Sequence, residues 1–146
     1  MPPIYFTLES AQRILPQVKK KVHQLREFGE AITFLENLEI ESENEYVNYR
    51  IDLKVEKEFH YLHYCFYQAL EELEAWGCII KDVEEGRVDF PHIFQGREVF
   101  LCWKWGERTI RHWHELEEGA GGRKGIVYLE DSRHKKKHDQ PQSQRH

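Results

Sequence analysis

Apolar residues recur at helical spacing in two long stretches of the N-terminal half of the chain. In each stretch the gaps are three or four residues, which keeps the apolar side chains on one face of a helix. The first face consists of Leu8, Ala11, Leu15, Val18, Val22 and Leu25, continued by Phe28, Ile32, Leu35 and Leu38. The second consists of Ile51, Val55, Phe59, Leu62, Phe66, Ala69, Leu73 and Trp76. Thr7 suits a helix start and Gly77 a helix end. Joined by the acidic segment 39–50, which we expect to be a loop, the two helices predict an antiparallel helical hairpin.

The apolar period changes after Gly77, and short strands replace helices. Residues 78–81 and 87–90 have the pattern of two short strands, the second ended by Pro91. Residues 97–104 form an apolar run typical of a strand covered on both faces, and residues 109–114 return as its partner. The sequence therefore predicts an α+β fold, with a long antiparallel helical hairpin followed by a small antiparallel β-sheet of 3–4 strands.

The turn between the last two strands sets their register. Gly106 and Glu107 fit a two-residue turn with glycine at its first central position. That turn pairs Leu101 with His112 and Val99 with His114, so both histidines should share the sheet face of Val99 and Leu101.

Charge divides the chain unevenly. Five Lys or Arg and one acid from Arg133 to His146 give this tail +4, which leaves −9 for the rest of a chain of net charge −5. We therefore predict a single α+β domain over residues 1–131 and a disordered basic tail over 132–146. An acidic domain makes nucleic acid an unlikely partner, because nucleic-acid binding needs a basic face.

Three cysteines without a pairing pattern favour reduced thiols, and so a cytoplasmic location. We see neither a signal peptide at the N-terminus nor an apolar stretch of membrane-spanning length, so we expect no membrane. Cys102 lies inside an apolar strand, which should raise the pKa of its thiol and exclude it as a nucleophile.

Histidines offer two candidate sites for a divalent metal. His112 and His114 are two apart on a strand, so both imidazoles point the same way and could ligate one ion. Alternatively, one histidine packs at the sheet end and the other is solvated. Glu56, His60 and His63 share one helical face, which is equally the spacing of an outer polar face.

Charged residues on the strands have two interpretations. Arg97, Glu98 and Asp89 could form ion pairs that tie the sheet together. They could instead line a pocket in which Arg97 binds an anion and Glu98 or Asp89 acts as a base. The glycine-rich segment 119–125 contains two cations and could hold phosphate, or be a flexible loop.

Four motifs resemble those of one known family. They are Tyr5–Ala11, Val88–Pro91, Gly96–Glu107 and Trp113–Gly119. Together they are similar to the prokaryotic domain-of-unknown-function family 2203, over a span from Tyr5 to Gly125. The family has no established activity. The resemblance implies a shared site, if there is one, at Asp89, Arg97, Glu98, His114 and Arg123. The family usually has an aromatic residue in place of His112 and does not require His60 or His63.

We weigh two functions. The favoured one is a non-catalytic interaction or oligomerisation domain, a homodimer formed through the helical hairpin. The alternative is a pocket around Arg97, Glu98 and His114 that binds an anionic ligand or carries a metal-dependent reaction. There Arg97, Arg123 and Asp89 would bind the ligand, while His114 and Glu98 would be the catalytic groups. A metal would lie at His112 and His114.

Overall fold

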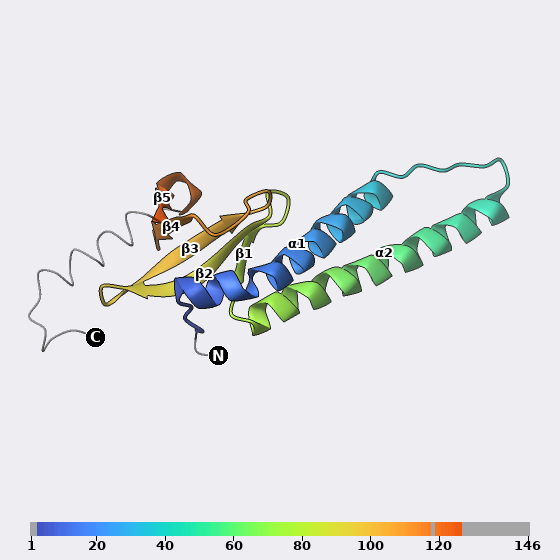
Figure 1. Ribbon diagram of the computed structural model, residues 1–146. Coiled ribbons are helices and arrows are strands. Elements are labelled where there is room, and N and C mark those ends of the chain that lie inside the picture. Colours follow the sequence, from blue (N-terminus) through green and yellow to red (C-terminus); the bar gives the residue numbers. More distant parts are fainter. Residues whose placement is uncertain (1–2, 118, 127–146) are drawn as a thin grey trace, which may run out of the picture.

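The computed structural model describes residues 3–117 and 119–126 (Figure 1). Helices α1 (Leu8–Glu36) and α2 (Glu45–Ala75) lie side by side and lead into one antiparallel sheet. The spatial order of its strands is the same as their order in the chain. The strands are β1 (Ile79–Asp82), β2 (Arg87–Phe94), β3 (Arg97–Lys104), β4 (His112–Glu115) and β5 (Lys124–Gly125). The 3-10 helix η1 (Gly119–Gly122) precedes β5. The α+β fold is confirmed. The sheet has five strands rather than the expected 3–4, because two-residue β5 is too short to leave a pattern in the sequence. The predicted tail 132–146 lies outside the described residues.

The helix starts are set by side chains that cap the first turns. Thr7 and Ser10 exchange hydrogen bonds between side chain and backbone at the start of α1, as predicted for Thr7. At the start of α2, the Asn44 side chain accepts from the backbone N–H groups of Tyr46 and Val47. Residues 45–50 are therefore helical, and the predicted loop 39–50 is too long by half. None of the helices in the described part of the chain is long and apolar enough to cross a membrane.

The core lies between the helices and one face of the sheet. The apolar face of α1 is buried from Ala11 to Leu25, against sheet residues that include Val99 and Leu101. In α2, Ala69 and Leu73 are the buried residues among those that the structure describes. Both lie near its sheet end, and the far half of the hairpin extends beyond the sheet (Figure 1).

Strand β2 continues through Pro91 to Phe94, so the prediction that Pro91 ends it is wrong. Pro91 lies opposite Phe100 of β3, but its carbonyl oxygen accepts from the N–H of Phe6 on the other side. In an antiparallel ladder the N–H and C=O of one residue point to the same neighbour. The missing N–H of Pro91 thus removes no bond to β3.

The predicted register of β3 and β4 is also wrong. The pairs are Phe100 with His114, Leu101 with Trp113 and Cys102 with His112. A one-residue shift moves side chains to the other sheet face. Both histidines therefore share the face of Phe100 and Cys102, away from the helices.

The connection between β3 and β4 explains this shift. Glu107 N–H bonds the Lys104 carbonyl, so Gly106, with φ +99°, is the second central residue of the turn rather than the first. Ile110 is then held against α1 by two hydrogen bonds to the Gln12 side chain, each 3.1 Å long. Because this segment is bound to α1, pairing with β3 begins only at His112.

Candidate functional site

The sheet face that points away from the helices carries a buried polar cluster formed by Asp89, Cys102 and His114. These residues come from β2, β3 and β4, and Asp89 lies directly opposite Cys102. Asp89 and His114 are each 1% exposed, and Cys102 is fully buried. Among the described residues, this is the group whose metal-ligating atoms all lie within 4.8 Å of one another.

The His114 ring is fixed by contacts at both nitrogens and on one face. Nδ1 lies 2.8 Å from the Glu115 carbonyl oxygen, and Nε2 lies 3.1 Å from Asp89 Oδ2. The ring also packs against Phe100, with 5.4 Å between the ring centres. Because a carbonyl oxygen can only accept, Nδ1 carries a hydrogen. Asp89 Oδ1 has no hydrogen-bond partner among the described residues.

Cys102 is a weak nucleophile in this arrangement. Burial, followed by the nearby negative charge of Asp89, raises the pKa of the Cys102 thiol to about 11. The thiolate is the reactive form of cysteine, so at neutral pH a free Cys102 would be almost entirely unreactive. This agrees with the sequence-based expectation for Cys102.

Arg123 and His112 belong to a second polar group beside the first. Arg123 Nη2 donates to both carboxylate oxygens of Glu107, at 2.8 and 2.9 Å, and lies 3.0 Å from His112 Nδ1. Glu107 Oε1 also accepts from the Lys104 backbone N–H. Arg123 is therefore already paired with a carboxylate, and an anionic ligand would have to compete with Glu107 for it.

Arg97 and Glu98 form separate contacts at the sheet edge. Arg97 makes two hydrogen bonds to Glu115, at 3.0 and 2.6 Å, and these raise the pKa of Arg97. Glu98 accepts from the Tyr5 hydroxyl at 2.8 Å, which raises the pKa of Tyr5. Alternation along β3 puts Arg97 on the face of Val99, opposite to that of His114.

The residues implied by the family resemblance thus fall into separate groups. Asp89 and His114 are in contact, whereas Arg123, Arg97 and Glu98 each have other partners. Sequence reasoning missed two members of these groups, Cys102 and Glu107. Both lie within the motif Gly96–Glu107, where strand packing accounts for Cys102 and a turn for Glu107 equally well.

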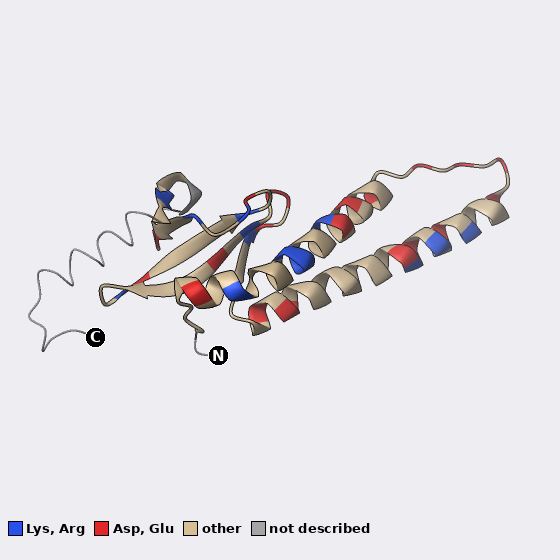
Figure 2. Ribbon diagram, in the orientation of Figure 1, with Lys and Arg blue, Asp and Glu red and all other residues tan. Residues whose placement is uncertain are grey.

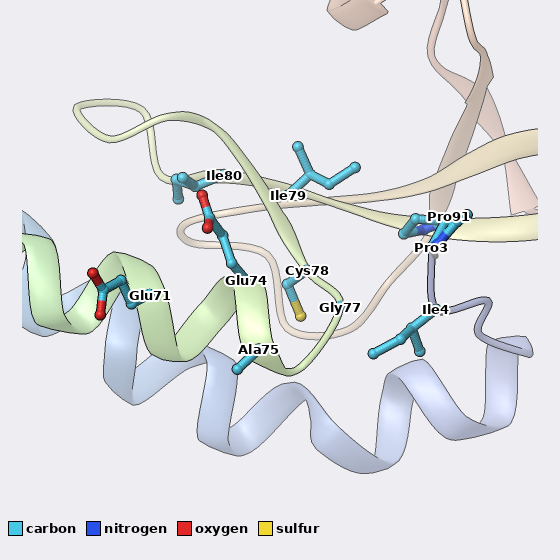
Figure 3. Close-up of a pocket in the computed structure, with 10 residues that line it drawn as sticks. All are labelled: Pro3, Ile4, Glu71, Glu74, Ala75, Gly77, Cys78, Ile79, Ile80 and Pro91. Atoms are coloured by element: carbon cyan, nitrogen blue, oxygen red, sulfur yellow. The ribbon is translucent and has the colours of Figure 1, made fainter. Parts of the chain in front are cut away.

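A groove lies elsewhere, between the end of α2, the N-terminal segment and β1 (Figure 3). Its volume is about 600 Å³. Its lining is mainly apolar, with Ile4, Cys78 and Ile80, and with the acidic Glu71 and Glu74 along the helix side. None of the site residues predicted from the sequence lines it.

A second surface feature follows the outer face of α2, defined as Tyr46, Tyr49, Leu53, His60, Tyr64 and Tyr67. At about 100° per residue, these side chains lie roughly 120° to 180° around the helix from Val55, Leu62 and Leu73, which face α1. All six are exposed. His63, from the candidate set with Glu56 and His60, instead lies 3.0 Å from the Phe59 carbonyl through Nδ1.

Comparison with known proteins identifies a family. The family described as Uncharacterized conserved protein (DUF2203) matches residues 4–126, which is most of the chain and includes every element above. The chain belongs to this family. Neither a curated protein nor a solved structure matches it. The family's matched span includes both the buried polar cluster and the outer face of α2.

Proposed function

We propose that this protein is a self-association domain, in which two copies pair through the outer faces of α2. The observation that carries this proposal is that α2 has apolar and aromatic side chains on two opposite sides, whereas α1 covers only one. A surface helix of a monomer normally has one apolar side and one charged side. The second side therefore suits a second helix.

The size of this surface supports a stable pair. The four tyrosines, Tyr46, Tyr49, Tyr64 and Tyr67, are between 58% and 66% exposed. At about 200 Å² per aromatic side chain, they present roughly 500 Å² per copy. A specific interface buries about 800 Å² per partner. Leu53, His60 and the aliphatic stem of Lys57 lie on the same side and bring the area close to this value.

The distribution of charge favours an antiparallel pair. Figure 2 shows acidic residues at the sheet end of α2 and residues of both charges toward its free end. In the sequence the sheet end carries Glu71, Glu72 and Glu74, and the free end carries Arg50 and Lys57 among acidic residues. A two-fold axis between His60 and Tyr64 would lay the acidic sheet end of one copy along the free end of the other, which carries Arg50. In a parallel pair the two acidic sheet ends would meet instead, which is unfavourable.

We also propose that the protein is cytoplasmic, and the argument for this rests on its cysteines. Cys65, Cys78 and Cys102 are free thiols. Cys78 and Cys102 are buried in the folded chain. Free buried thiols are typical of proteins that fold in a reducing compartment.

Sedimentation equilibrium of the full-length chain tests the pair. We expect a dimer at about 10 µM chain, because interfaces of this size bind with micromolar affinity or better. The double variant Tyr49→Glu, Tyr64→Glu should be monomeric at the same concentration with an unchanged circular-dichroism spectrum. Phe34→Glu is the matched control, since Phe34 is 65% exposed but lies on α1, and it should remain dimeric. A wild-type chain that stays monomeric up to about 100 µM would refute the proposal.

Charge reversal tests the antiparallel arrangement. Arg50→Glu alone should weaken the dimer by about five-fold, because the new carboxylate would lie beside the acidic sheet end of the other copy. Adding Glu74→Arg should restore the wild-type dissociation constant. If the two changes weaken the dimer additively, the helices do not pair in this way.

A further inference from the structure

We propose that Asp89, Cys102 and His114 form a mononuclear zinc site, independent of self-association through α2. A carboxylate oxygen, a thiolate sulfur and an imidazole nitrogen are the donor types that zinc takes from proteins, and the proton of the Cys102 thiol is released to solvent when the ion binds. A site with three protein ligands leaves one tetrahedral position for water or a substrate atom. The chemical class of ligand is thus a borderline-soft divalent cation, for which a sulfur–nitrogen–oxygen donor set selects zinc over magnesium or calcium.

The distances are close to those a tetrahedral ion needs. With metal–ligand bonds of about 2.0 to 2.3 Å, neighbouring ligand atoms around zinc are separated by roughly 3.3 to 3.6 Å. His114 Nε2 and Asp89 Oδ2 are 3.1 Å apart, and the three ligand atoms all lie within 4.8 Å of one another. Side-chain adjustments of about an ångström would complete the geometry.

The orientation of the His114 ring is the one that metal-ligating histidines adopt. Nδ1 donates its hydrogen to the Glu115 carbonyl oxygen, which in a neutral ring leaves the lone pair on Nε2. That lone pair points at Asp89 Oδ2, another electron-pair donor. Two such atoms 3.1 Å apart repel each other unless a positive charge lies between them, which is either a proton or a metal ion.

A second observation points to a bound cation. Asp89 is 1% exposed, yet its Oδ1 accepts from no nitrogen or oxygen donor among the described residues, and the Cys102 thiol beside the carboxylate is only a weak donor. A carboxylate oxygen buried without a strong partner is unfavourable. One proton shared with His114 satisfies Oδ2 alone. A divalent ion placed between the three side chains also offsets the remaining charge on the carboxylate.

Metal analysis of the full-length chain tests the site. The protein is prepared without an affinity tag and with His134, His138 and His146 replaced by glutamine, so that histidines of the tail contribute nothing. We expect about one zinc per chain after dialysis, as for a preformed protein site. Cys102→Ala should lose it, and Cys65→Ala, which removes the half-buried thiol of α2, should retain it.

Cobalt substitution keeps the test valid if Cys102→Ala fails to fold. Cobalt bound to a thiolate gives an intense charge-transfer absorption that carboxylate and imidazole ligands do not give. A chain with Cys102 as its single cysteine, made by Cys65→Ala and Cys78→Ala, should keep this band and lose it when zinc is added. If this variant, correctly folded, shows no such band and wild type holds less than about a tenth of a zinc per chain, the cluster is a proton-sharing pair and the proposal fails. A band that persists in Cys102→Ala would overturn it as well.

Discussion

Both faces of the middle of β3 are buried, but the two faces are stabilised in different ways. On the helix side, Val99, Leu101 and Trp103 are at most 1% exposed and join the apolar core. On the other side, Cys102 is fully buried beside Asp89 and His114, which are polar. The apolar face is stabilised by buried area and by the fit of its side chains, so it tolerates substitution by apolar side chains of similar size. The polar face needs a partner for every donor and acceptor, so loss of one side chain leaves another unsatisfied.

The largest expected effect comes from breaking the polar face. His114→Leu leaves the Asp89 carboxylate buried without its partner, and we expect the free energy of unfolding to fall by about 3–5 kcal/mol. Urea unfolding in the presence of a chelator measures this. The double variant Asp89→Leu, His114→Leu removes both polar groups and should recover most of the loss. A double variant as unstable as the single one would show that the pair matters by shape and not by charge.

A smaller loss is expected on the apolar face. Leu101 is fully buried, so Leu101→Ala should lower the free energy of unfolding by about 2–4 kcal/mol through lost burial and a residual cavity. The matched control is Leu53→Ala on the outer face of α2, where the leucine is 49% exposed. Measured on the monomeric chain, this control should change stability by less than about 0.5 kcal/mol. Equal losses at both positions would contradict the burial described for them.

The smallest effect is a pH dependence to which Cys78, on the helix side, contributes beside Cys102. Cys78 belongs to the apolar core, and burial raises the pKa of its thiol from 9.0 to about 12. Above pH 9 the unfolded chain releases a proton that the folded chain retains. Stability should therefore decrease by about 1.4 kcal/mol per pH unit between pH 9 and the pKa in the folded chain.

Denaturant unfolding at several pH values up to 10.5 measures this slope. Cys78→Ala should reduce it, since the variant has no thiol to ionise at that position. A slope that is the same in Cys78→Ala and wild type would assign the pH dependence to other groups.

The helices could be predicted because their signal is local. Spacings of three and four residues define each apolar face without knowledge of the rest of the chain, and Thr7 caps α1 as expected. The start of α2 was missed because Asn44 caps it seven residues before the first residue of the predicted apolar face. Asparagine is as common in loops as at helix starts, so composition alone does not distinguish the two.

The sheet register could not be predicted because it depends on distant contacts. Gly106 fits either central position of a turn, and the choice is made by Gln12, which binds Ile110 from α1. The error moved His112 and His114 to the wrong face. The sequence identifies both Asp89 and His114 as candidates. They lie on β2 and β4, on either side of β3, so their side chains meet only in the observed register.

The contacts of the N-terminal segment can form only after strands much later in the chain have been synthesised. Phe6 donates its N–H to Pro91, and its carbonyl oxygen lies 2.7 Å from His92 Nδ1. The apolar face of α1 is likewise covered by β2 and β3, which end at Lys104. At ribosomal rates of about 5–20 residues per second, roughly 3 to 14 seconds separate the synthesis of the end of α1 from that of the end of β3. The first residues made are thus among the last to be fixed, and the nascent α1 presents during that interval the kind of surface that chaperones bind.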